Sequence, residues 1–124
     1  MNPSGAMKPA FNQRVPDPEF RSMAAGFFNM LPSLTFWETL DDMSRGCSIT
    51  YEYDIMTFSW DDDDDVPPAG FVLFELFEDR ELVAAQDFMS IVRTAIAAEA
   101  KGNREQVQKG EQILERIAAR LNCS

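Results

Sequence analysis

Histidine is absent from the 124 residues of this sequence, and with it the commonest general base of enzymes. Nucleophilic catalysis of the familiar kind places such a base beside a serine or cysteine, so the usual catalytic triads are excluded. Only two cysteines are present, Cys47 and Cys123, and they lie far apart without CxxC spacing. Because that spacing and histidine ligands are both missing, we expect neither a zinc site nor a disulfide framework.

Long hydrophobic runs are missing as well. The longest candidate for a membrane span, residues 71–77, falls far short of the roughly 20 residues that a membrane-spanning helix needs. Residues 1–18 carry no apolar core of a secretory signal, so we expect a cytoplasmic protein without membrane contacts. The six glycines are scattered singly, which gives no support for a phosphate-binding loop, and we expect no cofactor.

Positive charge is scarce. The chain has 11 Lys and Arg residues against 21 Asp and Glu residues, for a net charge of −10. The imbalance lies in residues 38–81, where fourteen acidic residues accompany only Arg45 and Arg80, a net charge of −12. A concentrated negative field repels nucleic acids and anionic membranes and accelerates encounters with cationic partners. We therefore expect a basic protein partner and no nucleic-acid ligand.

Apolar residues are numerous enough for one core. The chain is 45% hydrophobic and has ten phenylalanines, and its length suits one ordinary domain but not two. Residues 1–18 hold four prolines among small and polar residues and show no sustained period, so we expect a flexible N-terminal arm. Residues 19–124 are expected to form a single domain.

Helical spacing of apolar residues predicts a first helix over residues 20–31, which a proline ends. A second helix follows, with Ser33 or Thr35 as its cap. Glu38 stands three residues after Thr35, as in a capping box, and Gly46 is suited to end the helix.

Two more helices are predicted in the last third of the chain. The first has apolar residues at helical spacing from Phe88 to Ile96 and ends before Gly102. The second begins near Arg104 and contains Gly110, which disfavours a helix by about 1 kcal/mol relative to alanine and leaves a break there open. We expect the final helix to bury Val107, Ile113, Leu114, Ile117 and Leu121.

Alternating apolar and polar residues predict a strand over residues 47–60. The alternation changes phase near Ile55 and Met56, and a bulge in one continuous strand is the simplest account. A second strand is predicted over residues 71–78 and a short third strand over 82–84, joined by a polar turn. The expected fold is α+β: one domain with a small antiparallel sheet of about three strands packed with about four helices, in the order ααβββαα.

Five consecutive aspartates follow Trp60 and form the most unusual feature of the sequence. They are Asp61, Asp62, Asp63, Asp64 and Asp65. Like charges repel, and aspartate is poor in helix and strand interiors, so the run does not stabilise the fold. It is either a solvated loop or a surface for a cation, and it lacks the alternation and glycine of a calcium loop. Trp60 beside it is either an interface anchor or a cover for the edge of the core.

Other carboxylates lie within predicted strands. Glu52, Asp54, Glu75 and the loop aspartates could meet on one sheet face, where carboxylate pairs can act as acid and base. The simpler interpretation is solvated surface, because nothing in the sequence marks a pocket or a perturbed pKa. We therefore do not expect an enzyme.

Two segments of the chain resemble a known family. They are FFNMLPSLTFWETLDDMSRGCSITYEYD at residues 27–54 and GFVLFELFEDRELVAAQDFMSIV at residues 70–92. The matching features are Phe28-Asn29-Met30, Met43-Ser44-x-Gly46 before a tyrosine-rich strand, the acidic linker, Gly70-Phe71, and Phe88. Over roughly residues 20–120 the chain resembles the bacterial immunity proteins of contact-dependent growth inhibition systems that neutralise ribonuclease toxins.

The resemblance implies a non-enzymatic protein that binds the toxic C-terminal domain of an exported effector as a 1:1 heterodimer inside the producing cell. A ribonuclease needs basic residues to hold phosphates, so an acidic surface can occlude its RNA-binding or active site. The predicted toxin-binding residues are Trp60, Asp61, Asp62, Asp63, Asp64, Asp65, Glu75, Glu78, Asp79, Glu52 and Asp54.

Two other functions stay open on the sequence alone. One is a carboxylate-based metal-binding protein or small enzyme that uses the same sheet face. The other is an acidic adaptor or DNA-mimic protein whose acidic face meets a different basic partner. Tight stoichiometric binding of divalent cations is expected only of the first.

Overall fold

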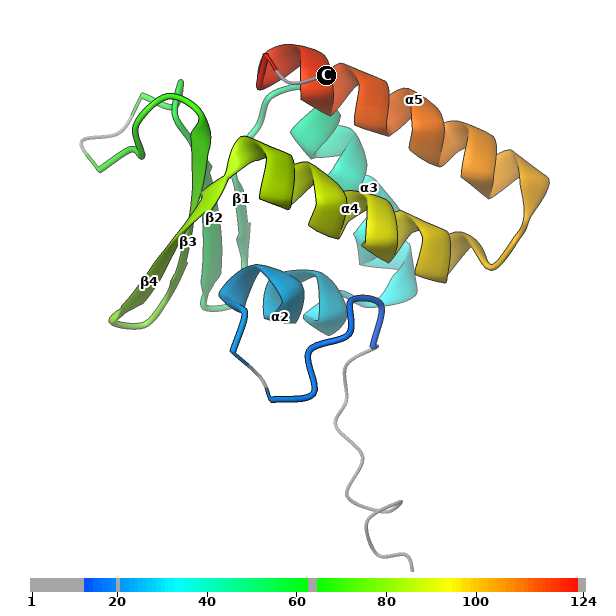
Figure 1. Cartoon of the computed structure of the whole chain (residues 1–124), viewed down its shortest axis with the longest axis horizontal. Coiled ribbons are helices and arrows are strands. Elements are labelled where there is room, and N and C mark those ends of the chain that lie inside the picture. Colours follow the sequence, from blue (N-terminus) through cyan, green and yellow to red (C-terminus); the bar gives the residue numbers. More distant parts are fainter. Residues whose placement is uncertain (1–12, 20, 63–64, 123–124) are drawn as a thin grey trace, which may run out of the picture.

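The computed structural model describes residues 13–19, 21–62 and 65–122. Within them, four helices and a four-stranded antiparallel sheet form an α+β domain, which confirms the predicted class with one strand more than expected (Figure 1). The elements are, in order, α2 (Met23–Met30), α3 (Ser33–Ser44), β1 (Ile49–Tyr51), β2 (Asp54–Phe58), β3 (Phe71–Leu76), β4 (Asp79–Ala84), α4 (Ala85–Ala100) and α5 (Arg104–Arg120). Each strand pairs with its neighbour in sequence, so the sheet order is β1-β2-β3-β4.

The additional strand comes from a tight turn at Glu52 and Tyr53. Tyr51 pairs with Asp54, so β1 and β2 form an antiparallel hairpin with a two-residue loop. The predicted continuous strand over residues 47–60 is therefore wrong, and so is its bulge. A reversal of the chain changes the phase of the alternation just as a bulge would. Glu52 makes the reversal with a φ of 56°, in the left-handed region.

The second hairpin also turns through two residues, Phe77 and Glu78. Leu76 pairs with Asp79, so β4 begins at Asp79 and the polar turn predicted over residues 78–81 is wrong. Polar residues are compatible with a strand here because β4 lies at the edge of the sheet, where charged side chains are common. Phe77 has a φ of 57°, at the loop position for which hairpins normally use glycine.

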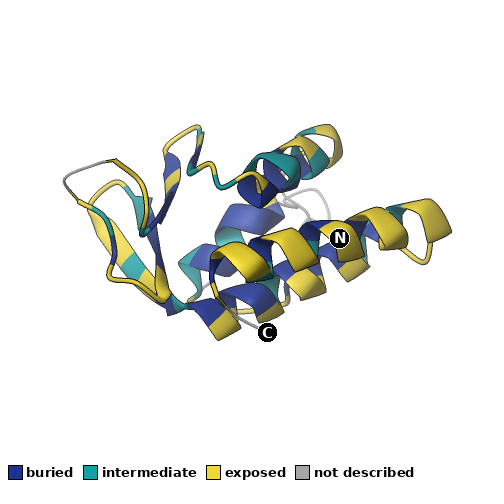
Figure 2. Cartoon of the chain, turned by 90° about the horizontal axis from the view of Figure 1, so that it is seen from above, coloured by how far each residue is buried: buried dark blue, intermediate teal, exposed yellow. Residues whose placement is uncertain are grey.

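The described helices all lie on one side of the sheet, and the core fills the space between the two layers (Figure 1). Figure 2 shows the buried residues on the inner faces of these elements and the exposed residues along the outer side of the helices. The ring centroid of Phe28 lies 5.3 Å from that of Phe27, 6.5 Å from that of Phe74 and 6.1 Å from that of Phe88. These rings belong to α2, β3 and α4, so aromatic packing ties the helical layer to the sheet.

Most helix ends follow local sequence signals. Ser22 caps α2 by accepting a hydrogen bond from a backbone N–H of the first turn, and Asn103 caps α5 in the same way. The predicted capping box of Thr35 and Glu38 does not form, because Pro32 occupies the N-cap position of α3 and no side-chain cap bond is made.

The final helix runs without a break through Gly110. This glycine is buried against Ile96 of α4, and a Cβ atom at position 110 would overlap Cγ2 of Ile96. Close approach of α4 and α5 therefore explains a glycine in the middle of a helix. Of the residues predicted to be buried in α5, Ile113, Ile117 and Leu121 are buried, Leu114 is half-buried and Val107 is exposed, contrary to the prediction.

The N-terminal segment packs on the domain at Arg14 and Val15, which are both buried. The side-chain amide of Asn29 accepts a hydrogen bond from Val15 N–H at 2.8 Å and donates one to Val15 C=O at 2.9 Å. Nε of Arg14 donates to Oε1 of Glu99 at 2.7 Å, and its Nη1 donates to a backbone carbonyl of α2 at 2.6 Å. The predicted flexible arm therefore does not extend to these two residues. Residues 1–12 lie outside the described part of the chain.

Candidate functional site

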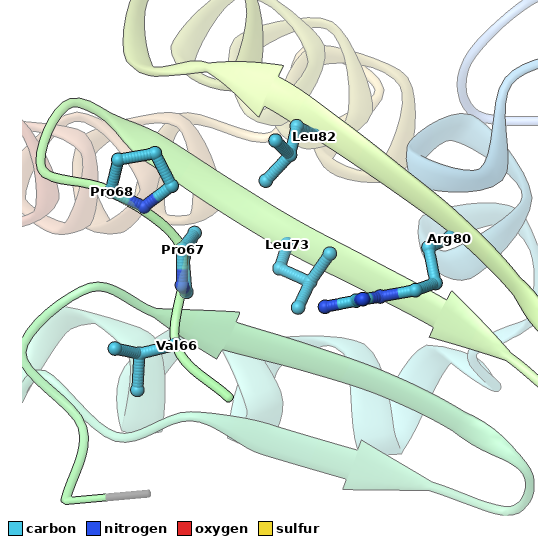
Figure 3. Close-up of a pocket in the computed structure, with 6 residues that line it drawn as sticks. All are labelled: Val66, Pro67, Pro68, Leu73, Arg80 and Leu82. Carbon is cyan, nitrogen blue, oxygen red and sulfur yellow. The ribbon is translucent and has the colours of Figure 1, made fainter. Parts of the chain in front are cut away.

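Residues 59–70, which we call the acidic loop, join β2 to β3 in sequence, and the described part of the loop at residues 65–68 lies on the outer face of the sheet, the face away from the helices (Figure 1). Pro67 and Pro68 lie over Leu73 of β3 and Leu82 of β4 (Figure 3). Pro67 and Leu73 are buried in this arrangement. The loop is therefore anchored by apolar contact, which neither interpretation of its sequence anticipated.

Arg80 is the single cation of residues 49–84, and it connects the acidic loop to the sheet. Its Nη2 lies 2.9 Å from Oδ1 of Asp65, and its Nε lies 3.5 Å from Oε2 of Glu75. The guanidinium thus offsets the charge of two predicted toxin-binding carboxylates. All three side chains keep contact with solvent, so these bridges orient the loop more than they stabilise the fold.

A cavity of about 370 Å³ lies where the acidic loop meets the sheet (Figure 3). It is lined by Val66, Pro67, Pro68, Leu73, Arg80 and Leu82. The walls are mainly apolar, and the Arg80 guanidinium supplies the charged group. No carboxylate is among its described lining residues, so this cavity does not hold the carboxylate pair that acid–base catalysis would require.

Trp60 stands where β2 enters the acidic loop. Its ring stacks on that of Phe58 with centroids 4.5 Å apart, and its indole N–H donates to the carbonyl of Gly46 at 2.8 Å. The residue nevertheless keeps 41% of its surface exposed. Trp60 thus covers the buried Phe58 and also presents part of its ring to solvent, beside the exposed Asp61 and Asp62.

The opposite end of the sheet carries the two hairpin turns, and two aromatic rings meet there. Tyr53 and Phe77 stack with centroids 5.2 Å apart and an interplanar angle of 28°. They are 69% and 75% exposed, although large aromatic side chains are normally well buried. The exposed carboxylates of Glu52, Glu78 and Asp79 are their neighbours in the same turns. We call these five residues the hairpin tips.

Sequence reasoning found the carboxylates of the hairpin tips and missed the aromatic pair. The only indication of the turn at Tyr53 was that the alternation of apolar and polar residues changes phase near Ile55 and Met56. A two-residue turn explains this change as well as a bulge does. Phe77 gave no signal of its own, because hairpin loops favour glycine, asparagine and aspartate. Its exposure follows from strand pairing between Leu76 and Asp79, which the sequence pattern did not reveal.

Asp54 lies on the inner side of the sheet, so it does not share a face with Glu75, as the acid–base alternative required. Glu75 pairs with Ile55 and points outward, so Asp54, one residue earlier, points toward α2. The two-residue turn at Glu52 and Tyr53 determines which residues of β2 face the helices. Asp54 is only 6% exposed and lines a cavity of about 240 Å³ beneath α2. Burial raises the pKa of Asp54 above its ordinary value of 3.8.

The predicted toxin-binding residues therefore occupy separate regions of the sheet. The regions are the hairpin tips with Glu52, Glu78 and Asp79, the loop end with Trp60, Asp61 and Asp62, the outer face with Asp65 and Glu75, and the inner face with Asp54. Asp63 and Asp64 lie outside the described residues. Because β3 rises about 3.4 Å per residue, its ends lie roughly 17 Å apart. One protein partner can span that distance.

Among the described residues, no group of three or more His, Cys, Asp or Glu side chains is arranged to hold a metal ion. In the same part of the chain, the helices lack the length and apolar character needed to cross a membrane. Compared with family models, curated proteins and solved structures, the chain matches none of them.

Proposed function

We propose that this protein is an immunity protein that binds and neutralises the ribonuclease toxin domain of a contact-dependent growth inhibition effector in a 1:1 complex. One observation carries the proposal. Residues 49–84, which form the sheet and its loops, contain eleven acidic residues and one arginine, whereas the rest of the chain contains ten of each sign. The sheet segment therefore accounts for the whole net charge of −10.

The placement of these carboxylates favours binding over catalysis. Among the described acidic residues of segment 49–84, Asp54 is the only buried one, and the others lie in turns, in the acidic loop or on strand faces in contact with solvent. Catalytic acids and bases are usually enclosed with a partner that perturbs their pKa. An open acidic surface instead suits a basic macromolecule.

A ribonuclease domain offers the matching chemistry. Its RNA-binding groove must present lysines and arginines to the phosphates of the substrate, so a polyanionic protein surface competes for the same groups. Complementary charge also steers the encounter, with association rates reaching ~10⁸–10⁹ M⁻¹s⁻¹ at low salt. Rapid capture matters for an immunity protein because unbound toxin degrades RNA in the producing cell. The family resemblance specifies a ribonuclease among basic partners.

The structure offers two kinds of contact at the ends of the sheet. Tyr53 and Phe77 at the hairpin tips and Trp60 at the loop end are exposed aromatic residues, the type that most often anchors interfaces. Exposed carboxylates accompany each of them, and such peripheral charges govern the association rate more than the affinity. We propose that the toxin domain contacts both ends of the sheet and crosses the acidic loop between them.

The proposal requires a large effector gene directly upstream of the gene for this protein, and co-expression with the C-terminal domain of that effector tests the function directly. The expected result is survival of the host cell, co-purification of the two chains in equal amounts, and loss of ribonuclease activity in the complex. If the domain remains toxic and fails to co-purify, the proposal is wrong.

Salt dependence tests the charged surface separately. We expect the double variant Asp61→Asn/Asp62→Asn to lower the association rate and to flatten its dependence on ionic strength. The matched control is Glu105→Gln/Glu111→Gln, which removes the same charge from exposed positions on α5. Equal effects of the two double variants would show that net charge, and not the acidic loop, governs association.

A further inference from the structure

The cavity beneath α2 has an unusual combination of linings. Three carboxylates border it, those of Asp17, Asp54 and Asp79, and the apolar side chains of Met23, Met30 and Leu76 form much of its wall. Asp54, Leu76 and Asp79 are register partners across β2, β3 and β4, so they make one row at the hairpin end of the sheet. Figure 1 shows α2 beside this end. We call this space the Asp54 cavity.

Asp54 is buried without a partner. Only 6% of the residue's surface remains exposed, and no described residue forms a hydrogen bond or ion pair with its carboxylate. A buried charge of this kind normally has a counter-ion or several donors, because loss of hydration is costly. The fold therefore gains nothing from an aspartate at this position. Its remaining accessible surface opens into the Asp54 cavity.

The charged residues that line the Asp54 cavity are all acidic. Asp17 accepts hydrogen bonds from the backbone N–H groups of Arg21 and Ser22 at 3.1 Å and 3.0 Å. Glu81 accepts one from the N–H of Ala24 at 3.1 Å, also at the start of α2. The helix Met23–Met30 contains no charged residue, and no basic residue is among the described lining of the Asp54 cavity. Nothing in the described chain supplies the missing positive charge.

An arginine side chain from a partner fits this lining best. Its aliphatic stem suits the apolar wall, and methionine side chains adapt their shape to such an insertion. Its guanidinium is more weakly hydrated than an ammonium ion and donates two parallel hydrogen bonds to a carboxylate, which lowers the cost of burial. A bare metal ion suits the site poorly, because half of these lining groups are apolar and offer no ligand.

We infer that the Asp54 cavity receives an arginine side chain of the protein partner, whose guanidinium pairs with Asp54. This inference rests on the proposed function, because the arginine belongs to the toxin domain. It adds a defined anchor to a surface that otherwise recognises positive charge in general. The neighbouring aromatic pair of the hairpin tips would then lie at the same contact, since Tyr53 adjoins Asp54 and Phe77 adjoins Leu76 in sequence.

The isolated protein allows a test without the toxin. Protein carrying ¹³C-methyl methionine is titrated with propylguanidinium, and with neutral propylurea as the matched control, at constant ionic strength. We expect saturable shifts of the Met23 and Met30 methyl signals with propylguanidinium only, whereas the buried Met43 and Met56 serve as references. Asp54→Asn should weaken the binding about tenfold or more, as loss of a charge-assisted hydrogen bond does. Glu111→Gln on α5 should leave it unchanged.

Three results would overturn the inference: no saturable shift at Met23 and Met30, an equal response to propylurea, or equal binding by Asp54→Asn. Binding and inhibition of the toxin domain test the proposed function separately from the cavity. If the toxin domain binds wild-type protein and Asp54→Asn equally well, the function stands and the arginine anchor is wrong. If propylguanidinium enters the cavity but no toxin domain binds, the cation site stands without the proposed partner.

Discussion

Tyr53 stacks on Phe77 across the tips of two neighbouring hairpins, with ring centroids 5.2 Å apart and both residues mostly exposed. Neither ring belongs to the buried core. Phe77 also adopts a φ of 57°, and a bulky residue in that region costs about 1–3 kcal/mol. An exposed pair that includes a strained residue is poorly explained by stability. It is well explained by an interface, where exposed aromatic residues supply much of the binding energy.

The variant Phe77→Asn separates these two explanations. Asparagine tolerates a positive φ, so relief of strain offsets the lost stacking and we expect the free energy of unfolding to change by less than about 1 kcal/mol. The affinity for the toxin domain should fall by about thirtyfold or more, as for an aromatic residue that anchors an interface. Denaturant unfolding and calorimetric titration measure the two quantities.

Leu34→Ala is the matched control for Phe77→Asn. Leu34 is also a large exposed apolar residue, but it belongs to α3 and not to a hairpin turn. Its truncation should leave the affinity for the toxin domain unchanged. If the two variants weaken binding equally, the hairpin tips have no special part in the contact.

Asp54→Asn is expected to stabilise the free protein while it weakens the complex. At neutral pH the buried, unpartnered carboxylate opposes folding, and an amide removes its charge without changing its shape. We expect the free energy of unfolding to rise by on the order of 1 kcal/mol at pH 7. A melting temperature below that of the wild type would contradict this assignment of Asp54 as a residue kept for binding.

The same comparison has a defined dependence on pH. Burial raises the pKa of Asp54 in the folded state above the ordinary value of 3.8. At low pH the carboxyl group is therefore protonated in both the folded and the unfolded protein and does not reduce the free energy of unfolding. Wild-type stability relative to Asp54→Asn should be highest there and fall as pH rises through the folded-state pKa. Asp17 and Asp79 also face the cavity, and the difference between the two proteins removes their common contribution. A difference that does not vary with pH would contradict the burial effect.

The fold class was predictable because it depends on periodic patterns. Phe27, Phe28 and Leu31 fall at helical spacing and become part of the core, as expected of an amphipathic helix. The sheet was partly predicted, since the strands around Phe58 and Phe74 were found but their ends were not. The turn at Glu52 and Tyr53 contains no glycine, asparagine or aspartate, so the usual hairpin signal was missing.

The candidate site depends on features that local sequence does not encode. The acidic run was visible at once, but its anchorage comes from Arg80 and from prolines that cover Leu73 across the sheet. The inward direction of Asp54 depends on strand parity, which the unrecognised turn reverses. The burial of Arg14 depends on Glu99, which lies 85 residues later in the chain. Such long-range contacts follow from tertiary packing alone.

Arg14→Ala is expected to destabilise the domain strongly, although Arg14 precedes the first helix of the described chain. The guanidinium lies over the ring of Phe36 at 4.4 Å and is hydrogen-bonded to Glu99, so its removal leaves a largely buried carboxylate without its salt-bridge partner. We expect a loss of about 3 kcal/mol in the free energy of unfolding. Arg21→Ala, which breaks an exposed pair with Glu19, should change it by less than about 0.5 kcal/mol.

Acid unfolding gives a second measure of the contact between Arg14 and Glu99. Burial acts to raise the pKa of Glu99, but hydrogen bonds from Arg14 and Ser33 and the positive charge of Arg14 outweigh it, so the pKa lies below the ordinary value of 4.5. The stability that Glu99 contributes is present above 4.5 and is lost as pH falls through the lowered pKa. Arg14→Ala should therefore show a weaker loss of stability on acidification below that value.

Gly110→Ala tests whether packing or helix propensity decides the stability of α5. Propensity alone predicts a gain of about 1 kcal/mol for alanine in a helix interior. The Cβ atom would overlap Cγ2 of Ile96, however, and overpacking of this kind costs about 1–3 kcal/mol, so we expect a net loss. In a double-mutant cycle by urea unfolding, Gly110→Ala should become neutral or stabilising in the background of Ile96→Ala, which removes the overlapping atom. A stabilising effect in the wild-type background would show that α4 and α5 separate at little cost and that the glycine is not needed for their contact.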